Sequence, residues 1–395
     1  MAQTKQTASK GWHVDEDTGA LVRDTIHRMG RRCRNWDYCG LGAYQITMVL
    51  ADRRAALFGA LRHDRIRGAH VEPNALGREI ESMAWRFSEF TPEIRMLGVC
   101  VMPDHVHLVL RVVRRLSPKK PLGIALRGFK GGATKAYWRC LGFSAEAQRS
   151  APGLKSPGPL FAEGFVDTIL FDESAVAQEL AYLGDNPRRA WEKHCHPELF
   201  RVLRDLTIEL GPGRKGHFAA IGNHALLKAR TILQVQCSRR HFAYRRDTGG
   251  ALLKKEPPAV VTKEFLEKRD TLLAAARHGA VLVSPCVSEG EREIARLAFE
   301  AGLRVVTLAN KGFSPLYKPG GKSFDACAAG NLLMLAPVAW PYLPAEKKMT
   351  RLDACVLNRL AQWIAGEGAV EMRYEGAVPG SIDDLAAAAV APVIG

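Results

Sequence analysis

Two histidines separated by one apolar residue are the first feature of this sequence that suggests chemistry. His105 and His107 flank Val106 in a segment that continues as Leu108-Val109-Leu110, an alternation typical of a β-strand. Residues i and i+2 of a strand point to the same face of its sheet, so the two imidazoles would project together. They could bind one divalent metal ion, or they could simply occupy the polar face of a sheet.

A tyrosine and an asparagine one helical turn apart are the second such feature. Tyr182 and Asn186 would share one face of a helix. A phenolic oxygen can attack phosphorus and keep the phosphoryl group as a covalent ester, if a cation neutralises the phosphate charge. A divalent ion on His105 and His107 would supply that charge, and the amide oxygen of Asn186 could complete its coordination. Oxygen ligands suit Mg²⁺ or Mn²⁺, and imidazoles favour Mn²⁺.

Each of these residues has an ordinary structural alternative. Tyr182 could pack its ring on an amphipathic helix, and Asn186 could cap that helix before Pro187. Tyr137 is a rival nucleophile, but the residue four positions on, Leu141, cannot bind a metal ion. Tyr137 therefore fits better as a core or base-stacking residue.

The elements that would position these residues can be read from the periodicity of the first half. We expect strands at 44–50, 94–101, 105–113 and 165–170, and helices at 74–90, at 122–140 and from Asp172 to a stop at Pro187. Residues 142–160, rich in Ser, Pro and Gly, predict a loop. This order of elements predicts an α+β domain with an antiparallel sheet.

The second half follows a different pattern, with short apolar strands that alternate with helices. We expect strands at 232–236, 280–284, 304–308 and 332–335, and helices at 264–278, 289–301 and 323–329. Ser288 with Glu291 predicts a capping box, and Gly302 a helix end. The alternation predicts a Rossmann-like α/β domain with a parallel, doubly wound sheet. We divide the chain into a loosely ordered segment 1–29, a first domain 30–206 and a second domain 207–395.

The second domain carries no GxGxxG or Walker A motif. The helix that follows Ser284 could bind an anion at its N-terminus. An accessory or dimerisation role without any ligand is an equally good interpretation.

The charge of the chain favours a polyanionic partner. Its 395 residues carry a formal net charge of +15, divided almost equally between the two halves. The helix at 122–140 repeats basic residues about one turn apart, and two arginines follow the Tyr182 helix. We expect DNA contacts from Arg127, Lys130, Lys135, Arg139, Arg188 and Arg189. A solvated helix face is the alternative for the basic residues of 122–140.

Several classes of protein are disfavoured by the rest of the composition. No apolar run approaches the roughly 20 residues of a membrane span. The first ten residues are polar, and the nine cysteines are scattered without a CxxC pair. We therefore expect a cytoplasmic protein with reduced thiols and no membrane partner.

Taken together, the motifs resemble those of the single-tyrosine HUH transposases. Met102-Pro103-Asp104-His105-Val106-His107, followed by Tyr182-Leu183-Gly184-Asp185-Asn186-Pro187, is similar to the MPxHxH and YIxxNP signatures of the REP-associated tyrosine transposases. The resemblance covers roughly residues 30–205. The second half more faintly resembles Rossmann-like DNA-processing (Smf-like) proteins, at Gly222-Asn223 and Cys237-Ser238-Arg239-Arg240.

The resemblance implies a ferredoxin-like fold and cleavage and rejoining of single-stranded or hairpin DNA through a 5′-phosphotyrosine intermediate. It implies that Tyr182 is the nucleophile, that His105 and His107 are metal ligands, and that the protein acts as a homodimer. Gly184, within the tyrosine helix, departs from what a stable helix prefers. The alternatives are a domesticated DNA-binding or regulatory protein with little cleavage, and an unrelated metalloenzyme that uses the histidine pair.

Overall fold

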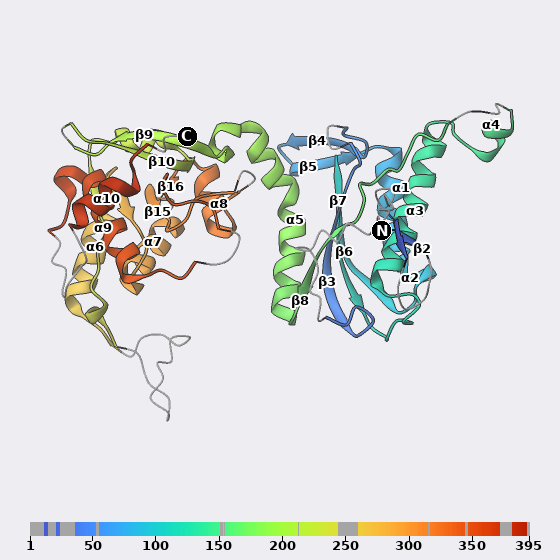
Figure 1. Cartoon of the computed structure of the whole chain (residues 1–395), viewed down its shortest axis with the longest axis horizontal. Helices are drawn as coiled ribbons and strands as arrows, with labels where there is room; N and C mark the ends of the chain where they lie inside the picture. The colour runs from blue at the N-terminus through green and yellow to red at the C-terminus, as the bar shows by residue number, and fades with distance from the viewer. Residues whose placement is uncertain are drawn as a thin grey trace, which may run out of the picture. The chain divides into compact units, whose positions relative to one another are not determined.

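The computed structural model (Figure 1) describes residues 12–14, 21–23, 36–52, 55–150, 153, 155–211, 213–243, 260–314, 317–343, 347–371 and 381–392. Of the predicted N-terminal segment 1–29, two short antiparallel strands are described, β1 (Trp12–Val14) and β2 (Leu21–Arg23). The rest of that segment lies outside the described residues. None of the described helices has the length and apolar character needed to cross a membrane.

The chain divides into two compact units, Met1–Trp191 and Glu192–Gly395. We expected this boundary after residue 206. It lies earlier because Leu203–Glu209 forms strand β9, which pairs with strand β10 (Lys215–Gly222) in the sheet of the second unit.

The first unit is built on an antiparallel sheet with the strand order β6-β7-β3-β8. Its strands are β3 (Gly42–Val49), β6 (Ile94–Met102), β7 (His105–Val112) and β8 (Val166–Leu170). All four coincide with segments predicted as strands. Pro103 and Asp104 form the turn between β6 and β7, so the histidine pair begins the second arm of a hairpin.

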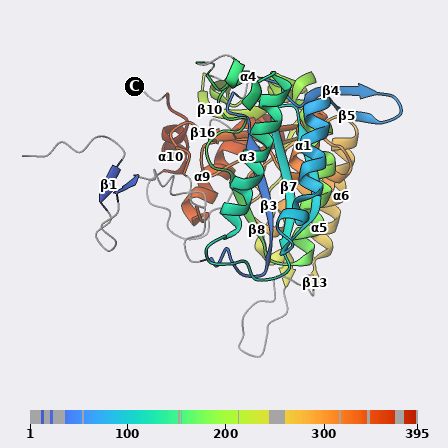
Figure 2. The same ribbon diagram turned by 90° about the vertical axis from the view of Figure 1, so that its right-hand side faces the viewer.

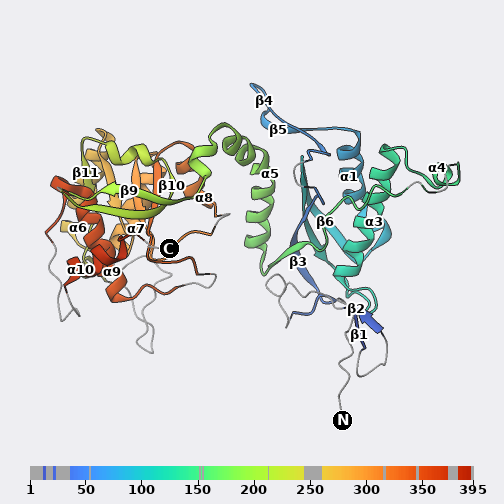
Figure 3. The same cartoon turned by 45° about the horizontal axis from the view of Figure 1, so that its top comes forward.

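Helices cover both faces of this sheet (Figure 3). They are α1 (Ala75–Trp85), α2 (Phe87–Phe90), α3 (Leu122–Cys140) and α5 (Glu173–Cys195). α1 and α3 pack on the face where Val106 and Leu108 are fully buried. α5 packs on the opposite face, where Leu183 belongs to the same core cluster as Val109. Strand alternation therefore places His105 and His107 on the α5 face.

The prediction that Pro187 ends the tyrosine helix is wrong, because α5 continues through it to Cys195. Proline lacks the N–H that would bond to the carbonyl of Leu183, which weakens a helix without necessarily ending it. The predicted N-cap is confirmed, since the carboxylate of Asp172 accepts a hydrogen bond from the backbone N–H of Ala175 at 2.7 Å. Packing of α5 on the sheet offsets the lost bond.

Two further segments of the first unit differ from expectation. The predicted helix 74–90 is two helices, because Asn74 caps α1 and the chain leaves helical geometry at Arg86. The predicted loop 142–160 contains a short helix, α4 (Ala145–Ser150). Composition alone disfavoured that helix because the flanking residues are rich in glycine and proline.

A two-stranded ribbon that the sequence reading did not anticipate precedes α1. It consists of β4 (Gly59–Asp64) and β5 (Gly68–Pro73), paired antiparallel. In Figure 2 it extends away from the sheet and its helices. The charged residues Arg62, Asp64 and Glu72 interrupt the apolar alternation that would have predicted these strands.

The second unit contains a six-stranded sheet with the order β11-β14-β15-β16-β10-β9. The parallel strands are β11 (Ile232–Gln234), β14 (Val281–Ser284), β15 (Val305–Leu308) and β16 (Leu332–Pro337). β10 and β9 extend the sheet with antiparallel pairing. The expected parallel core is present, but the complete sheet is mixed. A small antiparallel pair, β12 (Phe242–Ala243) and β13 (Val260–Val261), lies outside it.

Helices also cover both faces of this second sheet. They are α6 (Lys263–Arg277), α7 (Glu289–Glu300) and α8 (Gly321–Ala328) on one face, and α9 (Arg351–Ala365) and α10 (Ile382–Ala389) on the other. The predicted capping box of Ser288 and Glu291 is confirmed at the start of α7. Gly302 follows that helix with a φ of +63°, as expected for a helix-ending glycine.

Short 3₁₀ turns connect several elements of the second unit. They are η1 (Pro197–Phe200), η2 (His224–Lys228), η3 (Arg239–His241) and η4 (Gly366–Gly368).

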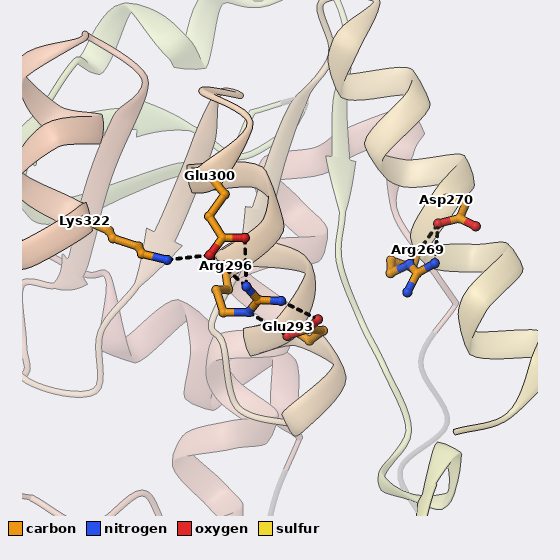
Figure 4. Close-up of polar contacts among 6 residues, drawn as sticks. All are labelled: Arg269, Asp270, Glu293, Arg296, Glu300 and Lys322. Carbon is orange, nitrogen blue, oxygen red and sulfur yellow. Dashed lines mark hydrogen bonds and ion pairs between the residues drawn. The ribbon is translucent and has the colours of Figure 1, made fainter. Parts of the chain in front are cut away.

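An ion-pair network joins two helices on the surface of the second unit (Figure 4). The guanidinium of Arg296 donates to the carboxylates of Glu293 and Glu300 on α7, and Lys322 of α8 also pairs with Glu300. The hydrogen bond from Lys322 holds the pKa of Glu300 below its usual value, and the bond from Arg296 does the same for Glu293. Arg269 pairs with Asp270 on α6.

Candidate active site

The histidine pair lies on β7 as the alternation predicts. The rings of His105 and His107 are 4.7 Å apart between centroids and are nearly perpendicular, while Val106 between them is fully buried on the other face. His107 is only 9% exposed. The two imidazoles therefore form one local cluster on the face of the sheet that α5 covers.

An acidic neighbour orients His105. Its Nδ1 lies 2.6 Å from Oδ1 of Asp104, the last residue of the β6–β7 turn. A carboxylate in this position fixes the imidazole tautomer with the proton on Nδ1. The Nε2 atom then keeps its lone pair.

Two polar residues of the neighbouring strand orient His107. β3 places Thr47 directly opposite His107, and Thr47 Oγ1 lies 2.9 Å from His107 Nδ1. The amide nitrogen of Gln45 lies 3.1 Å from the same Nδ1 and donates to Thr47 Oγ1 at 2.8 Å. Sequence reasoning did not identify Gln45 or Thr47. Their signal is two polar residues at i and i+2 in an otherwise apolar strand.

Tyr182 approaches the histidines from α5. Its ring lies 6.5 Å from the ring of His107 between centroids, at 76°. Tyr182 is 40% exposed, so a large substrate can reach part of this residue. On the same helix, the guanidinium carbon of Arg189 lies 5.3 Å from the centroid of the Tyr182 ring.

Asn186 lies one turn after Tyr182 and is buried, at 7% exposure. Its amide nitrogen Nδ2 is buried without a hydrogen-bond partner among the described residues. Such an orphaned polar atom in the interior is costly, and a functional ligand is one common reason for it. Because amide oxygen and nitrogen are assigned from their contacts, a flipped amide would place Oδ1 at the same point.

The two arginines after the tyrosine turn are both engaged by one carboxylate. Arg188 donates two hydrogen bonds to Asp185, at 2.6 and 2.9 Å, and Arg189 lies 4.0 Å from it. Arg189, with 12% of its side chain exposed, is the more buried of the two. The guanidinium of Arg189 also contacts the tyrosine ring.

The basic residues of α3 fall on the opposite face of the sheet from Tyr182. Arg127, Lys130 and Lys135 line a cavity of about 640 Å³ together with Trp138 and residues of the 156–164 segment. Lys130 donates to the carbonyl oxygens of Ala162 and Gly164, and burial lowers its pKa. Its ammonium group therefore ties a loop to α3.

The other basic residues of α3 differ in their availability. Arg139 pairs with Glu79 of α1 at 2.5 Å. Arg127 and Lys135 form no ion pair or side-chain hydrogen bond with the residues that the structure describes. Tyr137, the rival nucleophile, packs against the core on this same face and so lies on the other side of the sheet from the histidines.

The anion site considered at the start of α7 is occupied by the protein itself. The carboxylate of Glu291 accepts hydrogen bonds from the backbone N–H groups of Val287 at 2.7 Å, Cys237 at 3.3 Å and Ser288 at 3.4 Å. Burial raises the pKa of Glu291. Because an acidic side chain fills this N-terminus, the expectation that it binds an external anion is not supported.

The histidines are not part of a larger cluster of strong metal ligands. Across the described ranges, no three His, Cys, Asp or Glu side chains converge in a way that could hold a metal ion. A cation at His105 and His107 would therefore need oxygen from Asn186, water or a substrate phosphate.

Comparison with known proteins gives distant likenesses. No family model matches the chain. An uncharacterized protein of Haemophilus influenzae is 23% identical over 171 residues, which are 42% of this chain and 91% of that protein.

Two solved structures illustrate the structural likenesses. A REP-associated tyrosine transposase bound to a REP hairpin is 14% identical, with a TM-score of 0.27 over 40% of this chain and 73% of that one. DNA processing protein A from Helicobacter pylori, a single-stranded DNA-binding protein, is 15% identical, with a TM-score of 0.28 over 42% of this chain and 66% of that one. These values do not assign the chain to a family.

Proposed function

We propose that the first unit cleaves and rejoins single-stranded DNA, with Tyr182 as the nucleophile. The observation that supports this most directly is the placement of the Tyr182 ring against His107, from an element far along the chain. The hydroxyl is on a side chain that is 40% exposed, whereas His107 is buried. A reactive group at the surface beside an ordered polar cluster suits attack on a polymer that cannot enter a closed pocket.

The residues present suit a divalent cation, Mg²⁺ or Mn²⁺. If His105 and His107 donate from Nδ1 to Asp104 and Thr47, both Nε2 atoms keep a lone pair that can bind the metal, and the amide of Gln45 donates to Thr47 alone. Asn186 offers a buried amide with one end unpaired, which suits an oxygen ligand. When bound, the cation would neutralise charge on the phosphate oxygens of the substrate. Imidazole ligands with amide oxygen favour Mn²⁺ over Mg²⁺.

The reaction is a transesterification that balances without a nucleotide cofactor. The Oη atom of Tyr182 bonds to phosphorus as the bond from phosphorus to the 3′ oxygen breaks, which leaves a 5′-phosphotyrosine. The phenolic proton is lost to solvent, and the 3′ oxygen gains a proton and leaves as a hydroxyl. That hydroxyl, or one on another strand, attacks the phosphotyrosine and restores a phosphodiester.

Basic residues on both faces of the sheet would hold the DNA. Arg189 lies against the Tyr182 ring, where its guanidinium can contact a phosphate. Arg127 and Lys135 line the cavity on the α3 face and are the most available cations of that helix. Lys130 and Arg139, also expected to bind DNA, already serve the packing of the first unit.

The proposal is tested by trapping the covalent intermediate. Labelled single-stranded oligonucleotides, including hairpins from the flanks of the gene for this protein, are incubated with Mg²⁺ or Mn²⁺ and run on denaturing gels. The wild type should give a protein–DNA adduct that is absent in Tyr182→Phe and His107→Ala. Tyr137→Phe is the matched control and should keep the adduct, because Tyr137 lies on the other face of the sheet.

Two outcomes would overturn the proposal. An adduct lost only in Tyr137→Phe would move the nucleophile to α3. Tight binding of hairpin DNA without an adduct in either metal would favour a DNA-binding regulatory protein that does not cleave.

A further inference from the structure

An isoleucine at the tip of the β4–β5 ribbon is almost completely exposed. Ile66 is 96% accessible to solvent, the largest fraction among the exposed apolar residues of the described ranges. It lies in the three-residue turn between Asp64 and Gly68, with Arg65 before it and Arg67 after it. An apolar side chain held out between two cations has no packing role within the unit.

Hydrogen bonds to one carboxylate organise the turn at the tip. The carboxylate of Asp64 accepts hydrogen bonds from the backbone N–H groups of Ile66 at 2.9 Å and Arg67 at 2.6 Å. It also accepts from Arg67 Nε at 2.9 Å. Gly68 closes the turn with a φ of +65°, which residues with a side chain rarely adopt. These contacts hold the backbone of the turn that carries Ile66.

The ribbon contacts both elements that carry the candidate active site. The backbone N–H of Phe58, just before β4, donates to the carbonyl of Pro103 in the turn that precedes His105. Further along β4, the ring of His63 stacks on Trp191 of α5, with centroids 5.4 Å apart and planes at 25°. The ribbon is therefore anchored both to the histidine turn and to the tyrosine helix.

We propose that this ribbon is a DNA wedge, in which Ile66 inserts between base pairs of duplex DNA next to the cleavage site. The inference rests on the proposed function, since it takes DNA to be the substrate. Proteins that kink DNA commonly insert a bulky apolar side chain at a base step, and two-stranded ribbons fit DNA grooves. Arg65 has no ion-pair partner among the described residues, so it can contact phosphate beside the wedge.

The chemistry of the tip favours DNA over a second copy of the chain. An apolar contact between copies would bury Arg65 along with Ile66, and desolvating a charge is costly without a partner. The chain carries a net charge of +15, so another copy offers mostly like charge. DNA supplies a phosphate for Arg65 and stacked bases for the isoleucine.

The wedge is tested with DNA hairpins that carry 2-aminopurine at successive positions of the stem, since unstacking of this base increases its fluorescence. The full-length wild type should brighten the probe at one step, and Ile66→Ala should lose that signal. Affinity for the hairpin should fall about tenfold in Ile66→Ala, the loss expected when one unstacking contact is removed. Arg65→Ala should keep the fluorescence signal. It should reduce the slope of log affinity against log salt concentration by the amount expected for about one phosphate contact.

A matched control variant distinguishes loss of the Ile66 wedge from the loss of any exposed apolar side chain. Phe90→Ala removes another exposed apolar side chain, 74% accessible on α2, and should leave fluorescence and affinity unchanged. Equal probe fluorescence with wild type and Ile66→Ala would overturn the wedge. A change in oligomeric state on Ile66→Ala, measured by light scattering without DNA, would also overturn it and make Ile66 a contact between copies.

The wedge and the proposed function fail in different experiments. On a single-stranded oligonucleotide without a stem, wild type and Ile66→Ala should form the tyrosine adduct equally. An Ile66-dependent probe signal without any adduct would contradict the transesterase alone. An adduct without that signal would contradict the wedge alone.

Discussion

The Tyr182 ring meets the His107 ring nearly edge-on, at 6.5 Å between centroids. The two residues come from a helix and a strand that are far apart in the sequence, and the packing of Leu183 with Val109 brings these elements together. His107 is held by Thr47 and Gln45 of β3, whereas Tyr182 is partly exposed. The arrangement pairs a fixed, buried imidazole with an accessible phenol.

The hydrogen bond between Thr47 and His107 should control metal affinity. Thr47→Val keeps the shape of the side chain but removes the oxygen that lies 2.9 Å from His107 Nδ1. Loss of such a supporting contact typically weakens metal binding about 10- to 100-fold. Titration calorimetry with Mn²⁺ measures the change. Thr207→Val, at an exposed position of β9, should leave the affinity as in the wild type, and equal affinity in both variants would contradict the role of Thr47.

Asn186 should lower the stability of the metal-free protein and contribute to metal binding. Asn186→Leu removes a buried amide with an unpaired nitrogen and replaces it with an apolar side chain of similar size. Without metal, the free energy of unfolding should rise by about 1 kcal/mol, because an unsatisfied buried group is removed. Mn²⁺ should no longer raise the melting temperature of this variant, while Asn186→Asp, which keeps an oxygen, should still respond. An Asn186→Leu protein with an intact Mn²⁺ response would exclude Asn186 as a ligand.

Two glycines should respond oppositely to substitution with alanine. A Cβ at Gly184 of α5 would meet nothing within 4 Å, so Gly184→Ala should raise the free energy of unfolding by about 1 kcal/mol. A Cβ at Gly98 of β6 would lie 2.6 Å from Leu180 Cδ2 and 3.3 Å from Leu183 Cδ2. Gly98→Ala should therefore push α5 from the sheet, lower stability by about 1–3 kcal/mol and reduce adduct formation. Urea unfolding checks both signs.

The cations of α3 should contribute unequally to DNA binding. Arg127→Ala and Lys135→Ala should each reduce the slope of log affinity against log salt by about 0.7 on single-stranded DNA, the share of one phosphate contact. Arg139→Ala should change it less, because Arg139 already pairs with Glu79. Fluorescence anisotropy over a range of salt concentrations makes the comparison. Equal effects of all three substitutions would show that the ion pair with Glu79 does not keep Arg139 from contacting DNA.

Glu291 and Glu293 of α7 should make the stability of the protein depend on pH in opposite directions. Burial raises the pKa of Glu291, so the folded protein binds this proton more tightly than the unfolded chain. Its contribution to stability is present below the unfolded pKa, near 4.5, and is lost as the pH rises through the folded pKa. Arg296 lowers the pKa of Glu293, whose contribution is present above 4.5 and is lost as the pH falls.

Substitution with glutamine should separate the two groups. Urea midpoints measured from about pH 2 to about pH 8 should fall less steeply with rising pH in Glu291→Gln than in the wild type. In Glu293→Gln they should fall less steeply with falling pH. A wild-type pH profile in Glu291→Gln would mean that its carboxylate is not the group responsible.

The sequence by itself determined those features that depend on local periodicity and short spacing. Alternation over 94–113 predicted the β6–β7 hairpin and the shared face of His105 and His107, because a strand repeats every two residues. The 3.6-residue repeat predicted α3, and Ser288 with Glu291 predicted the start of α7. These signals reside in neighbouring residues and do not need the rest of the chain.

Only the tertiary structure decided which side chains from distant parts of the sequence come into contact. It also decided which helices continue through residues that disfavour them. Thr47 became a partner of His107 through strand register, and α5 continued past Pro187 because packing on the sheet offset a lost hydrogen bond. Folding also pairs Arg139 with Glu79 and leaves Arg127 without an ion-pair partner among the described residues, although one helix carries both arginines. The reason is physical: contacts between distant elements depend on packing and register, which no local pattern encodes.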